Sequence, residues 1–350
     1  MKKKKKLLIL QNKILNYRVP VYEELHKQYE VTVLHAGKPV NASFNEKILK
    51  SYKIGPFIFL KNFKKSTNKI NPDFILSMFD LHWPQYYINL PKYSKNVYWG
   101  LDNSKSSAVN FFKKVIVNFN KNNILFYSKP IQDNWLKKIN VSSFVAQNTV
   151  LVGEPSYIHE RNTYVNVGSL HYRKRNDILI KAYANLPREI INKSKVILVG
   201  SGPDEKRLKK LCRNLNIDNN ISFIGYIDDL ELLGSLYNSS ICSVSAGQAG
   251  LAVSQSLGYG VPFVTNKNAI TGGEIHGVVH GLNGHLLNSA IDDEACVKEL
   301  SNVMEFFWKS RKDIHLYKGC REYFNKKFIT GLYDTIYKKF TSWLKISRFK

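Results

Sequence analysis

Short apolar runs that end in glycine or other small residues recur through residues 163–287 and alternate with segments of helical character. Runs such as YVNVGSL, KVILVGSG and ICSVSAG have the length and branched composition of buried strands. An apolar strand, a turn of small residues and a helix form a unit that directs backbone N–H groups at a phosphate. Because the unit repeats, the pattern predicts a parallel sheet with helices on both faces. The runs lie at 164–170, 195–202, 221–226, 241–247 and 262–265.

The first half of the chain repeats this alternation with fewer glycines. A helix is expected over 19–29, with Pro20 near its first turn, where proline is tolerated. Residues 148–162 lack periodicity and contain Gly153 and Pro155, which is typical of a linker. Further strands are expected at 7–10, 31–36, 73–79, 96–100, 123–128 and 142–148.

Length and composition favour a folded α/β protein with two cores. The chain has 350 residues, of which 44% are hydrophobic, so a disordered protein is excluded. We expect two doubly wound, Rossmann-like domains at 1–150 and 163–325, a linker at 151–162 and a basic amphipathic helix at 326–350. No apolar run approaches the ~18 residues of a membrane span. The opening MKKKKKLLIL predicts a first strand better than a signal peptide, and four cysteines without CxxC spacing indicate a reducing cytoplasm.

The net charge of +25 is biased toward the first half of the chain. Residues 1–160 hold 25 Lys and Arg against 10 Asp and Glu, and the remainder holds 27 against 17. A basic surface of this size attracts anionic lipid, phosphorylated substrates or nucleic acid. Nothing resembles a helix-turn-helix, an RNA-binding sheet or a zinc finger, so nucleic acid is not an expected partner. A membrane contact is favoured, and a merely solvated surface remains the alternative.

The second half resembles a known family of enzymes. The segments VGSLHYRKRNDILIKAY, VILVGSGPDEKRLKKL, GLAVSQSLGYGVPFVT and GGEIHGVVHGLNGHLL follow the order and spacing of glycosyltransferase family 4. The resemblance is looser in the first half, where NYRVPVYEEL and YWG are similar to bacterial polysaccharide transferases of this group. It implies the GT-B architecture, in which two doubly wound domains face each other across a cleft.

The resemblance also implies a donor site around one lysine. Gly168 and Lys174 match the family's opening motif, in which Ser169 replaces an arginine. Lys174 is therefore the expected catalytic cation beside the diphosphate, where it would stabilise the charge of the leaving group. Arg173 or Arg175 is expected to supply the missing guanidinium. A solvated basic turn is the alternative.

Two glutamates of the family are absent from this chain. Their positions hold Gly247 and Gln255, and Gln255 is expected to hydrogen-bond a ribose diol. The segment 246–251 is similar to a branch of the family in which a glycine-rich turn replaces the first glutamate. That branch implies that backbone N–H groups at a helix start bind the diphosphate, and the N–H groups are those of Ala249, Gly250 and Leu251. The alternative is a catalytically inactive relative that serves as a partner subunit.

The remaining candidate residues rest on weaker matches. Gly200 and Gly202 match a second glycine turn near the nucleotide, and Tyr226 is expected beside the base. Glu274 aligns with a family glutamate and is expected either to contact the sugar or to cap a helix.

In the first half a family histidine is absent. Asp102 is the candidate for its polar role, and a helix cap is its alternative. Asn16 and Arg18 are expected on the acceptor or phosphate side of the site.

These residues together indicate transfer of a sugar from a nucleotide-diphosphate sugar to a hydroxyl of a polysaccharide or lipid-linked glycan, and the family resemblance implies that the transfer is retaining. No cofactor or metal is expected, because no DxD motif lies in the turns and Lys174 with the helix start would neutralise the phosphates. His276, His280 and His285 are spaced as metal ligands can be, but a surface loop is the better interpretation. The protein is expected in the cytoplasm, bound peripherally to the inner face of the membrane. A sugar epimerase of the same fold is a further alternative.

Overall fold

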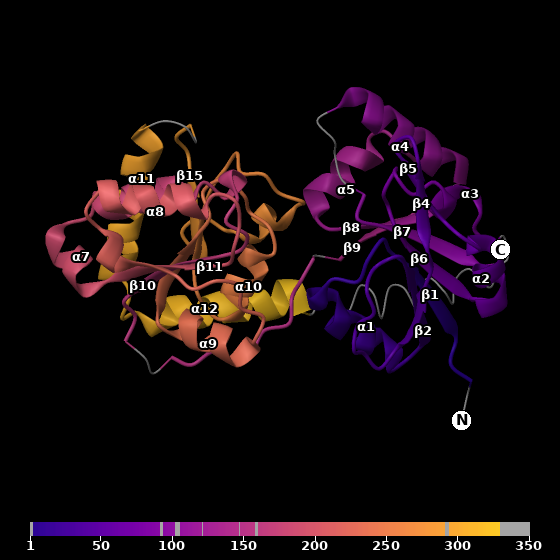
Figure 1. Ribbon diagram of the computed structural model, residues 1–350, viewed down its shortest axis with the longest axis horizontal. Helices are drawn as coiled ribbons and strands as arrows, with labels where there is room; N and C mark the ends of the chain where they lie inside the picture. The colour runs from indigo at the N-terminus through magenta and orange to yellow at the C-terminus, as the bar shows by residue number, and fades with distance from the viewer. Residues whose placement is uncertain are drawn as a thin grey trace. The chain divides into compact units, whose positions relative to one another are not determined.

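The computed structural model describes residues 3–91, 94–101, 106–120, 122–146, 148–157, 160–290 and 294–329. The chain divides into two compact units, residues 1–146 and 147–350 (Figure 1). This division lies four residues before the boundary expected from the sequence. Most of the expected basic helix at 326–350 lies outside the described residues.

The first unit contains a parallel sheet whose seven described strands follow the order β3-β2-β1-β6-β7-β8-β9. Strand order runs outward from β1 on one side and from β6 on the other, so the winding reverses between these two strands. Ligands of doubly wound sheets bind at such a reversal, outside the carboxyl ends of the strands. The strands are β1 (Lys6–Leu10), β2 (Glu30–His35), β3 (Asn45–Ile48), β6 (Phe74–Met78), β7 (Lys95–Trp99), β8 (Asn123–Phe126) and β9 (Ser143–Val145).

Helices and a separate hairpin complete the first unit. The hairpin pairs β4 with β5 in antiparallel register, with Ser51 opposite Leu60. The elements are η1 (Asn16–Arg18), α1 (Val19–His26), β4 (Ser51–Ile54), β5 (Phe57–Leu60), α2 (Phe63–Ile70), α3 (Gln85–Ile88), α4 (Ser107–Asn120) and α5 (Lys129–Leu136).

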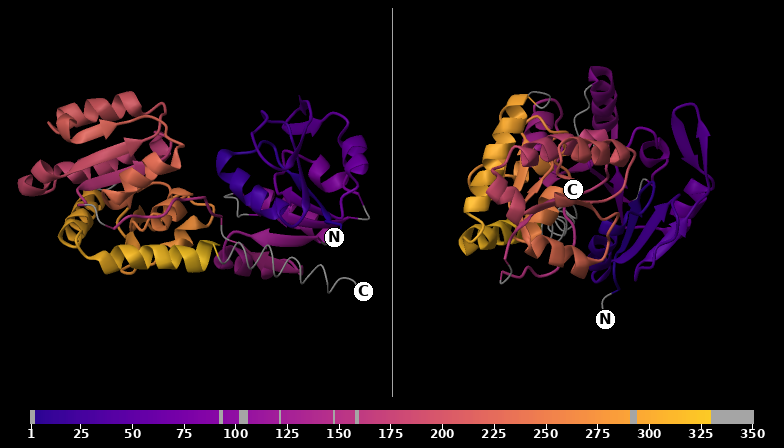
Figure 2. Two further views of the ribbon diagram at one scale, coloured as in Figure 1. Left: turned by 90° about the horizontal axis from the view of Figure 1, so that it is seen from below. Right: turned by 60° about the vertical axis from the view of Figure 1, so that its left-hand side comes forward.

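The second unit contains a parallel sheet of six described strands in the order β12-β11-β10-β13-β14-β15. Its reversal lies between β10 and β13, which pair directly with Val165 beside Ser243. The interior strands are buried on both sides, since helices cover both faces of the sheet (Figure 2). The strands are β10 (Thr163–Val167), β11 (Lys195–Val199), β12 (Ile221–Phe223), β13 (Ser240–Val244), β14 (Phe263–Asn266) and β15 (Gly284–Leu287).

The helices of the second unit supply most of its core. Ile178 and Ile180 of α6 belong to one buried cluster with Val297 and Leu300 of α11 and with the strands beneath them. The elements are η2 (Tyr172–Lys174), α6 (Asn176–Ala184), α7 (Arg188–Lys193), α8 (Glu205–Asn214), η3 (Asp218–Asn220), α9 (Leu230–Asn238), α10 (Ala252–Gly258), η4 (Glu274–Gly277), α11 (Glu294–Lys309), α12 (Ile314–Phe324) and η5 (Asn325–Ile329).

The structure confirms the expected parallel α/β architecture and every strand expected from the sequence. Three strands in the first unit, β3, β4 and β5, were not expected. The residues of β4 are all exposed and those of β3 are nearly so. β3 and β4 thus have no buried face and no apolar pattern to reveal them, whereas β5 is a short apolar run, FIFL, that the sequence analysis passed over.

Candidate active site

The reversal in the second unit brings two turns together. The turn after β10 contains Gly168 and Lys174, and the turn after β13 contains Gly247 and Gly250. Because β10 and β13 are neighbours in a parallel sheet, both turns leave the same edge. The candidate site of this unit therefore lies at the carboxyl ends of these two strands.

Gly200 and Gly202 hold the turn after β11 against the turn after β10. A Cβ on Gly200 would lie 2.0 Å from the Gly168 carbonyl oxygen, and one on Gly202 would lie 2.2 Å from that of Leu170. The Gly168 N–H donates to the Val199 carbonyl at 2.9 Å, and the Leu170 N–H donates to Ser201 at 2.9 Å. These glycines permit contact between two main chains, and Ser169 is left exposed.

Lys174 is the buried cation of the site. Its side chain runs under Gly168, since a Cβ on that glycine would lie 3.2 Å from the Lys174 Nζ. Gly168 has φ +149°, a conformation that favours glycine. Burial lowers the pKa of Lys174, the charge of Arg173 lowers it further, and Glu274 opposes both. An ammonium group so placed gains from an anion, because it is desolvated without an ion pair in the described part of the chain.

Arg173 and Arg175, on either side of Lys174, differ in whether their guanidinium groups already have a partner within the described part of the protein. Arg175 donates from Nε and Nη2 to both carboxylate oxygens of Asp177, at 3.1 and 3.2 Å. Arg173 is exposed and belongs to the same short helix as Lys174. Of the two guanidinium groups expected to replace the missing arginine, Arg173 is therefore the better placed.

Gly247 joins the turn after β13 to the Lys174 turn. Its N–H donates to the Lys174 carbonyl at 3.1 Å. A Cβ on Gly247 would lie 2.2 Å from the Arg173 carbonyl oxygen and 2.6 Å from Cγ of Arg175. The structure therefore has no room for the family's glutamate side chain at this position, which gives a steric reason for its absence.

One expected phosphate ligand is already engaged elsewhere. The N–H of Ala249 was expected to bind the diphosphate, but it donates to the Ile270 carbonyl at 2.9 Å, and Ala249 is fully buried. The expectation for this N–H is wrong, because residues 247–249 pair with the chain around Ile270. Gly250 and Leu251 are partly exposed just before α10, and they remain candidates.

Gln255 and Glu274 are partly exposed residues that follow the turn after β13 in the chain. The Tyr237 hydroxyl donates to Oε1 of Gln255 at 3.3 Å. The carboxylate of Glu274 accepts from Nδ2 of Asn148 at 3.1 Å and from the Gly272 N–H at 2.9 Å. Glu274 thus fixes its own turn, and its charge also acts on Lys174.

Tyr226 follows Gly225 beyond the end of β12, and its side chain is 66% exposed. This exposure leaves the ring face accessible, as stacking on a base requires. Its role beside the base stays a prediction.

The candidates of the first unit have different environments. Asn16 is exposed at the start of η1, after the carboxyl end of β1. Arg18 is only 4% exposed. Its Nη2 donates to the Tyr127 hydroxyl at 2.7 Å, and its guanidinium lies 4.0 Å from the ring centre of Trp99. Arg18 therefore packs inside the unit rather than facing an acceptor, which corrects the expectation. Asp102 lies outside the described residues.

The histidine cluster does not form a metal site in the described ranges. His280 and His285 have ring centres 4.2 Å apart, but no group of three or more His, Cys, Asp or Glu residues there is arranged to hold an ion. His276 is exposed in η4.

Sequence reasoning missed two buried polar residues of this region. Asn176 follows the Lys174 turn, is 1% exposed, and neither amide atom has a hydrogen-bond partner in the structure. Tyr237 stacks on Tyr259 with ring centres 4.9 Å apart and carries the hydroxyl that orients Gln255. In the sequence, the one sign of these two residues is that each is a polar residue within an apolar segment. That sign does not distinguish a ligand-binding residue from a buried polar residue that is hydrogen-bonded within the core.

Comparison with known proteins finds a family model that matches part of the second unit. Residues 154–316, just under half of the chain, match the family described as Glycosyl transferases group 1. An uncharacterized glycosyltransferase of Methanocaldococcus jannaschii is 29% identical over 49% of this chain and 44% of its own length. The N-acetyl-alpha-D-glucosaminyl L-malate synthase of Bacillus anthracis is 23% identical over 55% of this chain and 50% of its own. The chain thus spans half or less of the length of these two relatives.

Solved structures resemble the whole fold. The Anabaena protein HepE, crystallised with UDP, covers 97% of this chain and all of its own with a TM-score of 0.71 and 15% identity. The lipopolysaccharide outer core galactosyltransferase WaaB covers 95% of this chain and 99% of its own with a TM-score of 0.66 and 14% identity. Residues 154–316 therefore match the model of the Glycosyl transferases group 1 family, within a chain that has the GT-B fold.

Proposed function

We propose that this protein is a retaining glycosyltransferase of family 4 that moves a sugar from a nucleotide-diphosphate sugar to a hydroxyl. The observation that supports it most is the desolvated Lys174 ammonium beneath Gly168, in the domain that matches the family. The acceptor would be a polysaccharide or a lipid-linked oligosaccharide of the lipopolysaccharide or capsule type. The named neighbours include a lipopolysaccharide galactosyltransferase.

The proposed chemistry depends on stabilising the leaving diphosphate. The barrier is loss of the nucleotide diphosphate with positive charge developing at the anomeric carbon. Lys174 would neutralise the departing phosphate, assisted by the exposed Arg173 and the N–H groups of Gly250 and Leu251. Transfer on one face of the sugar lets the leaving phosphate accept the acceptor's proton, so this path uses no carboxylate base.

A donor screen tests the activity directly. UDP-, GDP- and dTDP-sugars are incubated with the full chain and lipid-linked acceptors, and release of nucleoside diphosphate is measured with and without acceptor. UDP-sugars are tried first, because HepE was crystallised with UDP and the pneumococcal transferase GtfA with UDP and GlcNAc. Acceptor-dependent release supports the proposal. Release without any acceptor would favour the epimerase, and no binding or turnover of any donor would favour an inactive partner subunit, an alternative the comparisons do not favour.

Donor affinity should depend on pH through Lys174. Its pKa lies below the ordinary value of 10.5, so its charge is lost at a lower pH than that of a free lysine. Affinity for UDP should therefore fall as the pH rises through that lowered pKa, by up to about tenfold per pH unit above it. Calorimetric titration between pH 7 and 10 measures the decline.

The matched control for this profile is Lys174→Arg, which keeps a charge that does not titrate in this range. Any change in the protonation of UDP affects its binding to the parent and to Lys174→Arg equally, so it does not contribute to the difference between the two profiles. A profile of the same shape in the parent and in Lys174→Arg would remove Lys174 from diphosphate binding.

We further propose that the first unit binds an anionic membrane surface. On helix α4, Phe111, Val115 and Phe119 recur every four residues and therefore share one face. They are 62%, 47% and 87% exposed. An exposed apolar face in the more basic half of the chain has the features of an interfacial helix. The aromatic and basic tail beyond residue 329 lies outside the described residues. Within those residues, no helix has the length and apolarity that crossing a bilayer requires.

Exchanging either Phe111 or Phe119 for serine should weaken binding to phosphatidylglycerol vesicles by about tenfold, since each buried ring contributes on the order of 1.5 kcal/mol. Vesicle sedimentation measures the partitioning. The matched control is Phe306→Ser, which removes a ring of similar exposure, 60%, from α11 in the other unit. Equal losses in the two proteins would contradict a specific role for α4.

A further inference from the structure

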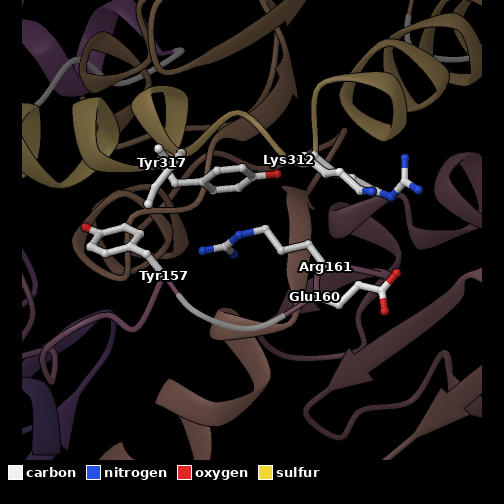
Figure 3. A pocket seen from close by; sticks show the side chains of 7 residues that line it. Tyr157, Glu160, Arg161, Lys312 and Tyr317 are labelled. Carbon is white, nitrogen blue, oxygen red and sulfur yellow. The ribbon is translucent and has the colours of Figure 1, made fainter.

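A pocket in the second unit is lined by none of the residues of the site described above. Its volume is about 460 Å³, which is within the size range of small-molecule sites. Cationic and aromatic side chains dominate its lining (Figure 3). The lining residues are Tyr157, Glu160, Arg161, Arg311, Lys312, Ile314 and Tyr317.

The pocket is at the opposite end of the sheet from Lys174. Arg161 lies two residues before β10 begins at Thr163, whereas Gly168 follows the last residue of that strand. Five strand residues at about 3.3 Å each separate the two ends by roughly 16 Å. A ligand of this pocket is therefore distinct from the proposed sugar donor.

Arg161 is a buried cation without a carboxylate. It is 4% exposed, and its Nη1 donates to the carbonyl oxygens of Tyr237 at 3.1 Å and Ser240 at 2.7 Å. Its guanidinium lies 3.7 Å from the ring centre of Tyr317, and in Figure 3 it extends between Tyr157 and Tyr317. Nη2 is buried and has no hydrogen-bond partner. A desolvated guanidinium with an unused donor gains strongly from an anion.

Arg311, another lining residue, repeats this arrangement. Its Nη1 donates to the Trp308 carbonyl at 2.7 Å, its guanidinium lies 3.8 Å from the Trp308 ring centre, and its Nε is buried without a partner. Lys312 is exposed at the rim, and Glu160, also exposed, is the one acidic lining residue. No ion pair of Arg161 or Arg311 occurs in the described ranges. The lining thus carries three cations and one carboxylate.

We propose that this pocket binds a phosphoryl group carried by a small molecule or a lipid headgroup. A net charge of +2 in the lining matches a phosphate monoester, which carries about −1.5 to −2 near neutral pH, better than it matches a single carboxylate. The planar guanidinium groups of Arg161 and Arg311 suit phosphate oxygens. The rings of Tyr157 and Tyr317 provide apolar walls for the part of the ligand that bears the phosphate.

The test is a calorimetric titration of the full chain with inorganic phosphate and with glycerol 3-phosphate. Both are repeated in the Lys174→Gln background, which removes the cation of the donor site. Lys312→Gln should weaken binding by about tenfold, the loss expected for one charge-assisted hydrogen bond, and Arg311→Gln by at least as much. The matched control, Lys309→Gln, removes one exposed cation from the end of α11 and should leave affinity within about twofold.

If a substitution at Arg161 or Arg311 prevents folding, Lys312→Gln still tests the proposal. The Lys312 side chain is exposed, so its replacement should not disturb the fold. Vesicles that contain phosphatidic acid, whose headgroup is a phosphate monoester, form the second arm. Vesicle binding that Lys312→Gln weakens and Lys309→Gln does not would identify a lipid headgroup as the source of the phosphate. Binding of soluble phosphates alone, with the same dependence, would identify a free metabolite. Absence of phosphate binding, or equal affinity in the Lys312 and Lys309 variants, would overturn the proposal.

Discussion

Exchanging Lys174 for methionine should lower the turnover number for sugar transfer by about 100- to 1,000-fold, as loss of one preorganised charge at a developing anion does. The fold should be retained. Lys174 is buried and forms no ion pair in the described part of the chain. Replacing it with an apolar side chain of similar length therefore removes the free-energy cost of burying an unpaired charge. We expect the free energy of unfolding to change by less than about 1 kcal/mol, or to rise. Steady-state kinetics and urea denaturation measure the two quantities.

Lys181→Met provides the matched control. Lys181 belongs to the adjacent helix α6, is 41% exposed and lies 3.8 Å from Glu294. Its loss should leave turnover unchanged. If Lys174→Met retained full turnover, the proposed role of the lysine would be wrong. If it lost activity only because it unfolded, denaturation would show this.

The largest effect on stability is expected at Gly247. Gly247→Ala should lower the free energy of unfolding by about 3 kcal/mol, because the new methyl group would overlap the Arg173 carbonyl oxygen at 2.2 Å and must displace the main chain. The same displacement moves Lys174, whose carbonyl accepts from the Gly247 N–H. A shift of about 1 Å at a catalytic group costs on the order of 100-fold in rate, so activity should fall with stability.

The matched control is Gly250→Ala in the same turn, where an added Cβ meets no atom within 4 Å. Its unfolding free energy should stay within about 1 kcal/mol of the parent. Thermal or urea denaturation compares the two. Equal stability of the two alanine variants would show that the turn adapts and that the missing glutamate has another cause.

Much of the fold can be predicted from the sequence, because strands buried in a parallel sheet are short, continuous apolar segments. Runs such as that around β11, Lys195–Val199, are apolar on both faces and end in glycine. The edge strand β3, Asn45–Ile48, was missed because exposure leaves no such pattern. Its pairing with β2 depends on backbone hydrogen bonds, which any residue other than proline can form.

The candidate site was only partly predictable for a different reason. Motif spacing found Lys174, since the distance along the chain from Gly168 is fixed by the turn. It did not reveal that Ala249 donates to Ile270, or that Arg18 packs on Trp99, because these partners are distant in sequence. The spacing of a motif along the sequence shows which residues belong to one turn. Whether a ligand can reach those residues depends on which other parts of the fold cover them.

The closely packed glycines at positions 200, 202 and 247 have a consequence for how the donor preference of the proposed transferase could change. A side chain at any of these positions would displace a neighbouring main chain rather than reshape the site, because each added Cβ would lie within 2.2 Å of a carbonyl oxygen. Evolution, or a laboratory library, must therefore work at the rim, where Ser169, Arg173 and Tyr226 expose their side chains. Variants with new donor preferences should accumulate at those three positions and leave the glycines untouched.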